Sequence, residues 1–350
     1  MKVDKMKPKL TLVEYLKKLQ RKARNCHGVD FYGKYEAIRR YLESHVYKQV
    51  EVGAALKGDG LLTGHGKEHV DDVIDHMCKL LLHDYRDLNI YEVFLLLIAA
   101  LIHDIGNVGG RTAHEKRIAT AIEGCEEFES LDDPTKHYVI TIAEAHGGRT
   151  SVGDKDTLSV LRREDYLGGE CIRTRALAAL LRFADELADN FMRFNADMER
   201  LGQIPECNRL YHMYSKCLQP VVANGVTLSF VYSMSDHLAK EEFPKVVNDK
   251  ERPLYLLDEI FNRLMKAFSE MEYCVKHGGG LFHFEGIDST ITVFSSDLRK
   301  ELVSIPIRIK DSGFPNRAKE FVDLLEEPLK EEFRSGKNMA KYLLDNYANK

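Results

Sequence analysis

The chain has 350 residues, of which 44% are hydrophobic and 30% charged, and it contains no tryptophan. This composition is that of ordinary globular proteins and excludes a disordered, collagen-like or long coiled-coil protein. The net charge of -5 argues against a general nucleic-acid-binding surface, although it allows a local basic patch. The chain has 14 histidines and 7 cysteines, and the positions of the histidines decide the interpretation.

The cysteines and the apolar segments indicate the compartment. The 7 cysteines are odd in number and form no C-x-x-C pair, which argues against a zinc knuckle or a disulfide framework. The basic start, Met1–Lys9, is not followed by an apolar signal core. The longest apolar run, Val93–Ile102, is shorter than the ~20 residues that span a membrane. We therefore expect a cytoplasmic protein.

The first two thirds of the chain show helical periodicity, with apolar residues at three- and four-residue spacings. Tyr91–His103 is apolar on nearly all sides, which predicts a central buried helix. The glycine-rich stretch Gly53–Gly66 is expected to be a loop. The other predicted helices cover Leu10–Lys22, Lys34–Val46, His69–Leu81, Ala113–Ile122, Thr135–Ala145 and Arg173–Phe194.

After about residue 215 the pattern changes to that of strands, which are rich in Val, Ile, Thr and Phe. Strands are predicted over Gly225–Ser233, Ser289–Ser295 and Leu302–Ile309, a helix over Leu254–Val275, and terminal helices over Arg317–Asn349. We therefore expect a mainly α protein, a helical bundle with a smaller C-terminal α+β domain. The predicted divisions are N-terminal helices over 1–55, the main helical domain over 56–214, and the α+β domain over 215–350.

Three predicted helices carry polar residues that suit a metal ion. His103 and Asp104 are adjacent at the end of the buried helix, where unpaired polar groups would be costly. His69 begins an amphipathic helix, and Asp185 lies in the mostly apolar helix LAALLRFADELA. Helices of a bundle can bring such side chains together in the core. Imidazole and carboxylate donors suit Mn, Fe, Zn, Co or Ni better than Ca.

The order H…HD…D in HGKEHVDDV, LLLIAALIHDIGN and LLRFADELADN resembles the HD-domain superfamily of metal-dependent phosphohydrolases over roughly residues 60–195. The resemblance implies an HD domain over 56–214 and a site for one or two divalent metal ions (Mn, Fe, Ni, Co, Zn or Mg). In the family the matching residues bind one ion, and the aspartate of the HD pair bridges to a second ion where there is one. Those residues are His69, His103, Asp104 and Asp185.

Two further histidines, His114 and His146, resemble the extra histidines of family members that bind two metals. The stretch LRFADELADNFMR is similar to a subgroup with the pattern L-R-x-A-D-x-L-D-x-x-x-x-R, many of them bacterial and associated with defence or with ATPase partners. The related HD-GYP phosphodiesterases have a lysine where this chain has Asn107, and the GYP motif is absent here. This departure argues against cyclic di-GMP as the substrate.

Other residues near the predicted ligands are candidates for the catalytic machinery. His65, four residues before His69, is a candidate second donor or substrate contact. Asp189 is placed to orient Arg193 or a ligand. The candidates for holding phosphate oxygens are Lys67, Arg111, Arg149 and Arg193.

Nine histidines are interpreted as core or surface residues without a role in the chemistry: His27, His45, His76, His83, His137, His212, His237, His277 and His283. Gly278–Gly280 is not followed by an obvious helix N-terminus. It therefore predicts a flexible turn and not a phosphate cradle.

These observations predict a metal-dependent phosphohydrolase or phosphodiesterase that acts on a nucleotide or related phosphate ester through a metal-activated water, with Asp104 holding both ions. A nuclease on single-stranded nucleic acid is an alternative, but the net acidity does not support the basic groove that it needs. A second alternative is a regulatory HD protein that senses a nucleotide or binds a partner without turnover. A third is an interaction protein whose C-terminal sheet dimerises or joins a partner protein.

Overall fold

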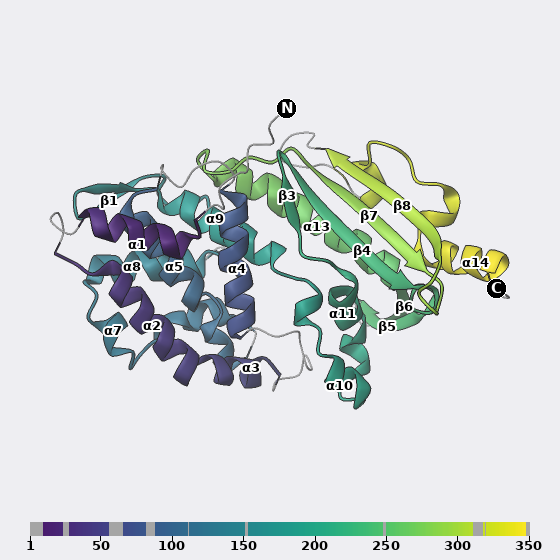
Figure 1. Cartoon of the computed structure of the whole chain (residues 1–350), viewed down its shortest axis with the longest axis horizontal. Helices are drawn as coiled ribbons and strands as arrows, with labels where there is room; N and C mark the ends of the chain where they lie inside the picture. The colour runs from purple at the N-terminus through teal and green to yellow at the C-terminus, as the bar shows by residue number, and fades with distance from the viewer. Residues whose placement is uncertain are drawn as a thin grey trace.

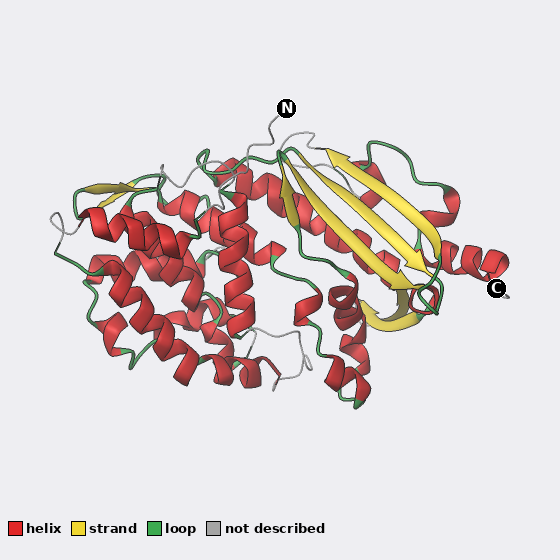
Figure 2. Ribbon diagram, in the orientation of Figure 1, coloured by secondary structure: helices red, strands yellow, loops and turns green. Residues whose placement is uncertain are grey.

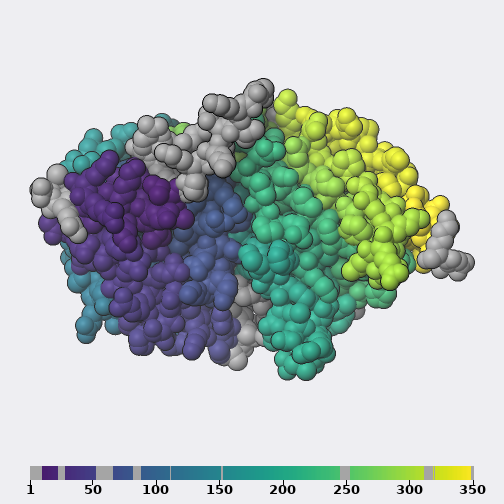
Figure 3. All heavy atoms as spheres, in the orientation of Figure 1, coloured from purple at the N-terminus to yellow at the C-terminus, as the bar shows by residue number. Residues whose placement is uncertain are grey.

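The computed structural model describes residues 10–23, 28–55, 66–81, 88–110, 112–150, 153–247, 250–310, 318 and 320–347. The chain is mainly α with a smaller α+β part, as the sequence predicts. The N-terminal helices and the later sheet lie side by side along the longest axis of the molecule (Figures 1 and 2). The space-filling view shows the same order from the purple N-terminal helices to the yellow C-terminal segments (Figure 3).

Helix α5 (Ile90–Ile102) is the core of the helical half, and all of its residues are buried. Its N-terminus is closed by a capping box, in which Asn89 and Glu92 each bond the other's main chain. Glu92 also binds the guanidinium of Arg173, the N-cap residue of α9 (Thr174–Leu187). Among the described residues, one segment, Ile90–Gly109, is long and apolar enough to cross a membrane, and 89% of its apolar window is buried inside the structure. This segment is therefore enclosed by the rest of the protein, as a core helix is.

Other helices of this half pack against α5 or against the elements that contact it (Figure 1). They are α1 (Leu12–Ala23), α2 (Phe31–His45), α3 (Tyr47–Ala55), α4 (Lys67–Leu80), α7 (Glu126–Glu129) and α8 (Asp133–Glu144). The prediction of a loop from Gly53 is wrong at its start, because α3 extends to Ala55. Tyr47 and Val50 of α3 are buried, so packing outweighs the weak helix propensity of Gly53. Residues 56–65 of that predicted loop lie outside the described part of the chain.

Two predicted helices are shorter than expected. The segment predicted over Ala113–Ile122 forms the 3₁₀ helix η3 (His114–Arg117) and the short α6 (Ile118–Ala121), because Ala113 has a left-handed φ of 55° and cannot begin an α-helix. Helix α9 ends at Leu187, before the predicted Phe194. Asn190 then accepts a bond from the main chain of Met192 and begins the 3₁₀ helix η4 (Phe191–Arg193).

The sheet half contains a four-stranded sheet in the order β3-β4-β7-β8. Strands β4 and β7 are parallel, and the other neighbours are antiparallel. Buried and exposed residues alternate along β8, as its sequence predicts. The strands of this sheet are β3 (Val222–Asn224), β4 (Thr227–Ser235), β7 (Gly286–Phe294) and β8 (Glu301–Lys310).

Two short hairpins and several helices complete the fold. The sequence analysis did not predict the hairpins, β1 (Asp165–Leu167) with β2 (Glu170–Ile172) and β5 (Glu242–Val247) with β6 (Lys250–Tyr255). The other elements are η2 (Ile105–Gly109), α10 (Ala196–Arg200), α11 (Glu206–Cys217), α12 (Asp236–Lys240), η5 (Phe321–Leu324), η6 (Glu331–Phe333) and α14 (Gly336–Tyr347).

Helix α13 (Leu256–His277) connects the two halves. It runs behind the sheet in Figure 1 and packs against α9. One of its faces carries the buried residues Leu264, Phe268 and Met271. Another carries charged residues that bind α9: Lys266 pairs with Glu186 at 2.7 Å and Glu270 with Arg182 at 2.8 Å. A helix that belongs to the sheet half in sequence therefore also faces the helical half.

Candidate metal centre

The HD pair lies where α5 ends. His103 is the C-cap residue of α5, and Asp104 is the N-cap residue of η2. The turn that follows is tight, because a Cβ atom at Gly106 would collide with the main-chain carbonyl of His114. Glycine at 106 thus allows η3, which carries His114, to approach the end of α5.

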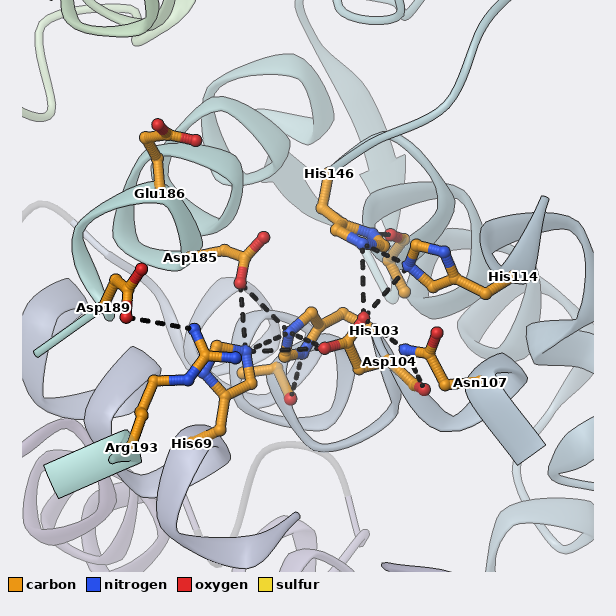
Figure 4. A network of polar contacts seen from close by, with 12 residues as sticks. His69, His103, Asp104, Asn107, His114, His146, Asp185, Glu186, Asp189 and Arg193 are labelled. Carbon is orange, nitrogen blue, oxygen red and sulfur yellow. Dashed lines mark hydrogen bonds and ion pairs between the residues drawn. The ribbon is translucent and has the colours of Figure 1, made fainter. Parts of the chain in front are cut away.

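His69, His103 and Asp185 form one potential metal-binding group, drawn from three helices. Their donor atoms lie within 4.8 Å of one another. His69 Nε2 is 3.1 Å from Asp185 Oδ1 and 3.3 Å from His103 Nε2. Figure 4 shows the three side chains pointing toward one another. The two histidines are buried and Asp185 is half-buried. Asp185 is the member of this group that lines the cavity described below.

Asp104, His114 and His146 form a second group that meets the same limit of 4.8 Å. His114 Nε2 lies 3.0 Å from Asp104 Oδ1 and 3.2 Å from His146 Nε2. His146 comes just after α8, whereas His114 begins η3. The structure therefore brings together all six residues that the sequence analysis selected as metal ligands.

Asp104 lies between the two groups (Figure 4). Its Oδ1 faces His114 and His146, at 3.0 and 3.8 Å. Its Oδ2 faces His69 and His103, at 3.5 and 3.6 Å. One carboxylate thus offers a separate oxygen to each group, which is the arrangement that a bridging ligand requires.

Neighbouring groups fix the orientation of the ligands. Nδ1 of His103 donates to the carbonyl of Ala100 at 2.9 Å, and Nδ1 of His146 donates to the carbonyl of Ala143. Because a carbonyl can only accept, Nδ1 carries a hydrogen in both rings, and the lone pair of Nε2 is directed toward the metal-binding groups. Asn107 Nδ2 donates to Asp104 Oδ1 at 3.0 Å. Asn107, which the sequence analysis treated only as a departure from the HD-GYP pattern, therefore positions the central carboxylate.

The electrostatics of the site favour a bound cation. Burial opposes a positive charge on His103, yet Asp104 and Asp185 raise its pKa to about 9. Burial works against the carboxylate of Asp185, but hydrogen bonds from His103 and His69 hold its pKa well below the usual range. Burial lowers the pKa of His146 to about 4, so this imidazole is neutral near pH 7. The two carboxylates thus favour a positive charge at His103, and a divalent metal ion, which binds anionic oxygens and neutral imidazoles, would replace the proton on His103.

A cavity of about 260 Å³ opens onto the two groups. Asp104, His114, His146 and Asp185 line it together with cationic side chains from several parts of the chain. These cations are Lys155, Arg182, Arg193, Arg263 and Lys266. Of this set, the sequence predicts only Arg193 as a phosphate contact. Arg263 and Lys266 come from α13, and no local motif connects them with the HD pattern.

The other predicted catalytic residues lie in different surroundings. Lys67 is exposed, and its Nζ lies 3.4 Å from Glu43 Oε1. Arg149 is also exposed and donates to the carbonyl of Gly153 at 2.7 Å. His65 and Arg111 lie outside the described residues.

Asp189 and Arg193 lie next to the metal groups (Figure 4). Arg193 Nη1 is 4.0 Å from Asp189 Oδ1, and both residues line the cavity. Asp189 also accepts a bond of 2.6 Å from Ser215 of α11. The carboxylate is therefore held by two elements and is placed to orient Arg193, as its position one turn after Asp185 suggests.

The chain matches one protein family among known proteins. A protein-family profile described as HD-CE matches residues 59–242, which is more than half of the chain. No curated protein and no solved structure matches significantly. The matched region contains both metal-binding groups and continues past residue 214 through β4 and α12.

Proposed function

The chain belongs to the HD-CE family, and from this membership we propose that it is a metal-dependent phosphohydrolase or phosphodiesterase acting on a nucleotide or related phosphate ester. The observation that carries the proposal is the position of Asp104. Its two oxygens face two separate groups of His and Asp side chains. A carboxylate in this position can bridge two divalent ions.

The residues present fit such ions. His69, His103 and Asp185 would hold one ion, and His114 and His146 the other, with Asp104 shared between them. Bound there, two divalent ions would activate a water for attack on phosphorus and neutralise the charge that develops on the phosphate. The donors are nitrogen and oxygen atoms only, so Mn, Fe, Co, Ni, Zn and Mg are the candidate metals.

The chain's own cations would hold the substrate. Arg193, Arg263 and Lys266 line the cavity beside the metal groups and are positioned by carboxylates. Lys266 donates to Glu186 at 2.7 Å, and Arg263 donates to Glu259 at 2.8 Å. These contacts restrict the side chains before a phosphate binds, which lowers the entropy lost on binding.

The cavity favours a small phosphate ester over a strand of nucleic acid. Its volume of about 260 Å³ is below that of the usual drug-sized pocket. Among the described residues that line it, none is Phe, Tyr or Trp. Proteins that bind single strands stack successive bases on aromatic side chains along a basic groove.

The test is a hydrolysis screen with the full chain over nucleotides, cyclic nucleotides and oligonucleotides, supplemented in turn with each candidate metal. The Asp104→Ala chain is the blank. We expect hydrolysis of a nucleotide or related ester that depends on added metal and disappears in the blank.

Two results would contradict the proposal. One is an Asp104→Ala chain that keeps full metal content and turnover. The other is a metal-loaded chain that hydrolyses no member of the screen, which would favour the regulatory alternative.

A further inference from the structure

Helices α9 and α13 line two separate cavities. One is the metal-centre cavity described above. The other has a volume of about 350 Å³ and lies at the first turn of α9 and the last turn of α13. Four cationic side chains, one carboxylate and one imidazole dominate its lining: Arg163, Arg173, Arg175, Lys276, Glu164 and His277. We refer to it as the basic pocket.

The basic pocket is lined by more cationic side chains than carboxylates, since Glu164 is the one carboxylate among the described residues that line it. Arg173 is held by two bonds of 2.8 Å to the buried Glu92, so its charge is largely balanced. Arg175 instead donates to the main-chain carbonyls of Ser159 and Leu161, which fix the guanidinium without cancelling its charge. Arg163 and Lys276 are exposed at the surface. The pocket is therefore a local basic site on a chain with a net charge of -5.

His277 gives the basic pocket a buried polar group that needs a partner. Its side chain lines the pocket, and the residue is 8% exposed. Within the described part of the chain its Nε2 has no hydrogen-bond partner. The ring packs edge-on against Tyr273, with centroids 4.9 Å apart. A buried nitrogen without a partner costs free energy that a bound acceptor would recover.

The charges that surround His277 show that the pocket has a positive potential. Burial lowers the pKa of His277, and the charges of Lys276, Arg175 and Arg163 lower it further. Asp156 acts in the opposite direction but is engaged by the hydroxyl of Tyr273 at 2.6 Å. Arg163, Arg175 and Lys276 outnumber the carboxylates Asp156 and Glu164 around the ring, and this surplus of positive charge favours an anion.

The backbone adds to this preference. Helix α9 has 14 residues, and its first turn lies at the pocket. The main-chain N–H of Arg173 already donates to Glu92 and that of Arg175 to the carbonyl of Arg162, so α9 contributes through its dipole and not through these two groups. Gly279, which follows α13 with a φ of +57°, comes so close that an added Cβ would lie 3.3 Å from Ala176 Cβ in the first turn of α9. No helix begins directly after Gly278–Gly280 in the sequence. In the folded chain these glycines instead lie beside the N-terminus of α9, which comes about 100 residues earlier.

We propose that the basic pocket binds a phosphate-type anion, either inorganic phosphate or the phosphomonoester of a small molecule. Arg163, Arg175 and Lys276 supply the charge, and Nε2 of His277 donates a hydrogen bond to an oxygen of the anion. This site is distinct from the metal centre and does not depend on the proposed hydrolytic activity.

The test uses the full Asp104→Ala chain in the presence of a chelator, so that no phosphate binds through a metal ion. Phosphate held by the cations of the metal-centre cavity is recognised because its affinity does not change in variants of the basic pocket. Inorganic phosphate is titrated calorimetrically into this chain and into three further variants of it. Arg163→Gln with Lys276→Gln removes two exposed charges, and His277→Asn removes the buried donor. Arg299→Gln is the control, because Arg299 is exposed and lies between β7 and β8.

We expect one saturable phosphate site per chain, with affinity at least tenfold lower in the double variant, about fivefold lower in His277→Asn and unchanged in Arg299→Gln. Absence of saturable binding, or equal affinity in all the variants, would overturn the proposal. Ribose 5-phosphate and AMP are titrated in parallel. Binding of either ester tighter than that of phosphate supports a phosphomonoester ligand, and equal or weaker binding supports the free ion.

Discussion

The helical half and the sheet half of the molecule both have apolar cores, but they bury different polar groups. The core of the helical half contains buried ionisable side chains, including His69, His103, Asp104 and His146. In the described strands of the four-stranded sheet, the buried polar residues are Ser289 and Thr292, and the buried ionisable groups of this half, such as Glu259 and Glu272, lie on its helices. Burying ionisable groups is costly in both halves, and the meeting of several of them around one point in the helical half indicates where the chemistry is.

Helix α13 modifies this division. It covers the sheet with one face, and with another it adds Arg263, Lys266 and Glu270 to the cavity at the metal centre. The helical half therefore supplies the metal ligands, whereas both halves supply the side chains that would hold a substrate. Four variants would test this comparison, beginning with the largest expected effect.

Replacing Asp104 by asparagine should have the largest effect. The variant keeps the shape of the side chain but removes the charge shared by the two groups. We expect loss of bound metal at both positions and a decrease in turnover of roughly a thousandfold or more. Metal analysis and hydrolysis assays measure these effects. Retention of two ions per chain would show that Asp104 is not the shared ligand.

Ile305→Ala should affect stability without affecting the metal centre. Ile305 lies in β8 and is 2% exposed. Truncation of such a side chain costs about 2–5 kcal/mol of the free energy of unfolding, measured by urea denaturation. The folded variant should bind as much metal as the unchanged chain. If the folded variant also lost metal, metal binding in the helical half would depend on the packing of the sheet half.

His76 should make the helical half sensitive to acid. Burial lowers the pKa of His76 from 6.5 to about 4, so the unfolded chain binds more protons than the folded chain between these values. Stability is therefore lost as the pH falls from 6.5 toward 4, by about 2 kcal/mol at pH 5.

His76→Leu removes this titration. The difference in unfolding free energy between pH 7 and pH 5 should become smaller in the variant by that amount. The quantity compared is the difference in unfolding free energy between pH 7 and pH 5. An effect of the substitution that is the same at both pH values cancels in this difference. An identical pH dependence in both chains would exclude His76 as the cause.

Lys266→Gln should have the smallest effect and tests the contribution of α13 to the site. Lys266 lines the cavity and is held by Glu186. We expect KM to rise about tenfold, or about 1.4 kcal/mol, with metal content unchanged. Lys240→Gln is the matched control, because Lys240 also pairs with a carboxylate, that of Asp236, but does not line the cavity. Equal KM values in both variants would remove Lys266 from the substrate site and leave Arg263 as the cation that α13 contributes.

Much of the fold was predictable because the relevant signals are local. The apolar run of α5, the amphipathic pattern of α4 and the alternation along β8 depend on neighbours within a few residues. The predicted helix boundaries are wrong where tertiary packing or backbone conformation outweighs the local sequence pattern. Packing of Tyr47 and Val50 extended α3 through Gly53, and the left-handed backbone of Ala113 delayed the next helix.

The residues that could hold a metal are identifiable from the sequence, because the HD pair and its partner residues lie in recognisable segments. The folded arrangement is needed to see that Asp104 faces both groups, that Asn107 orients it, and that α13 completes the cavity. The basic pocket likewise depends on the meeting of α9 and α13, whose contacts join residues such as Glu186 and Lys266 across 80 positions. Side chains this far apart show no periodicity or spacing in the sequence, since only the packing of the two helices brings them together.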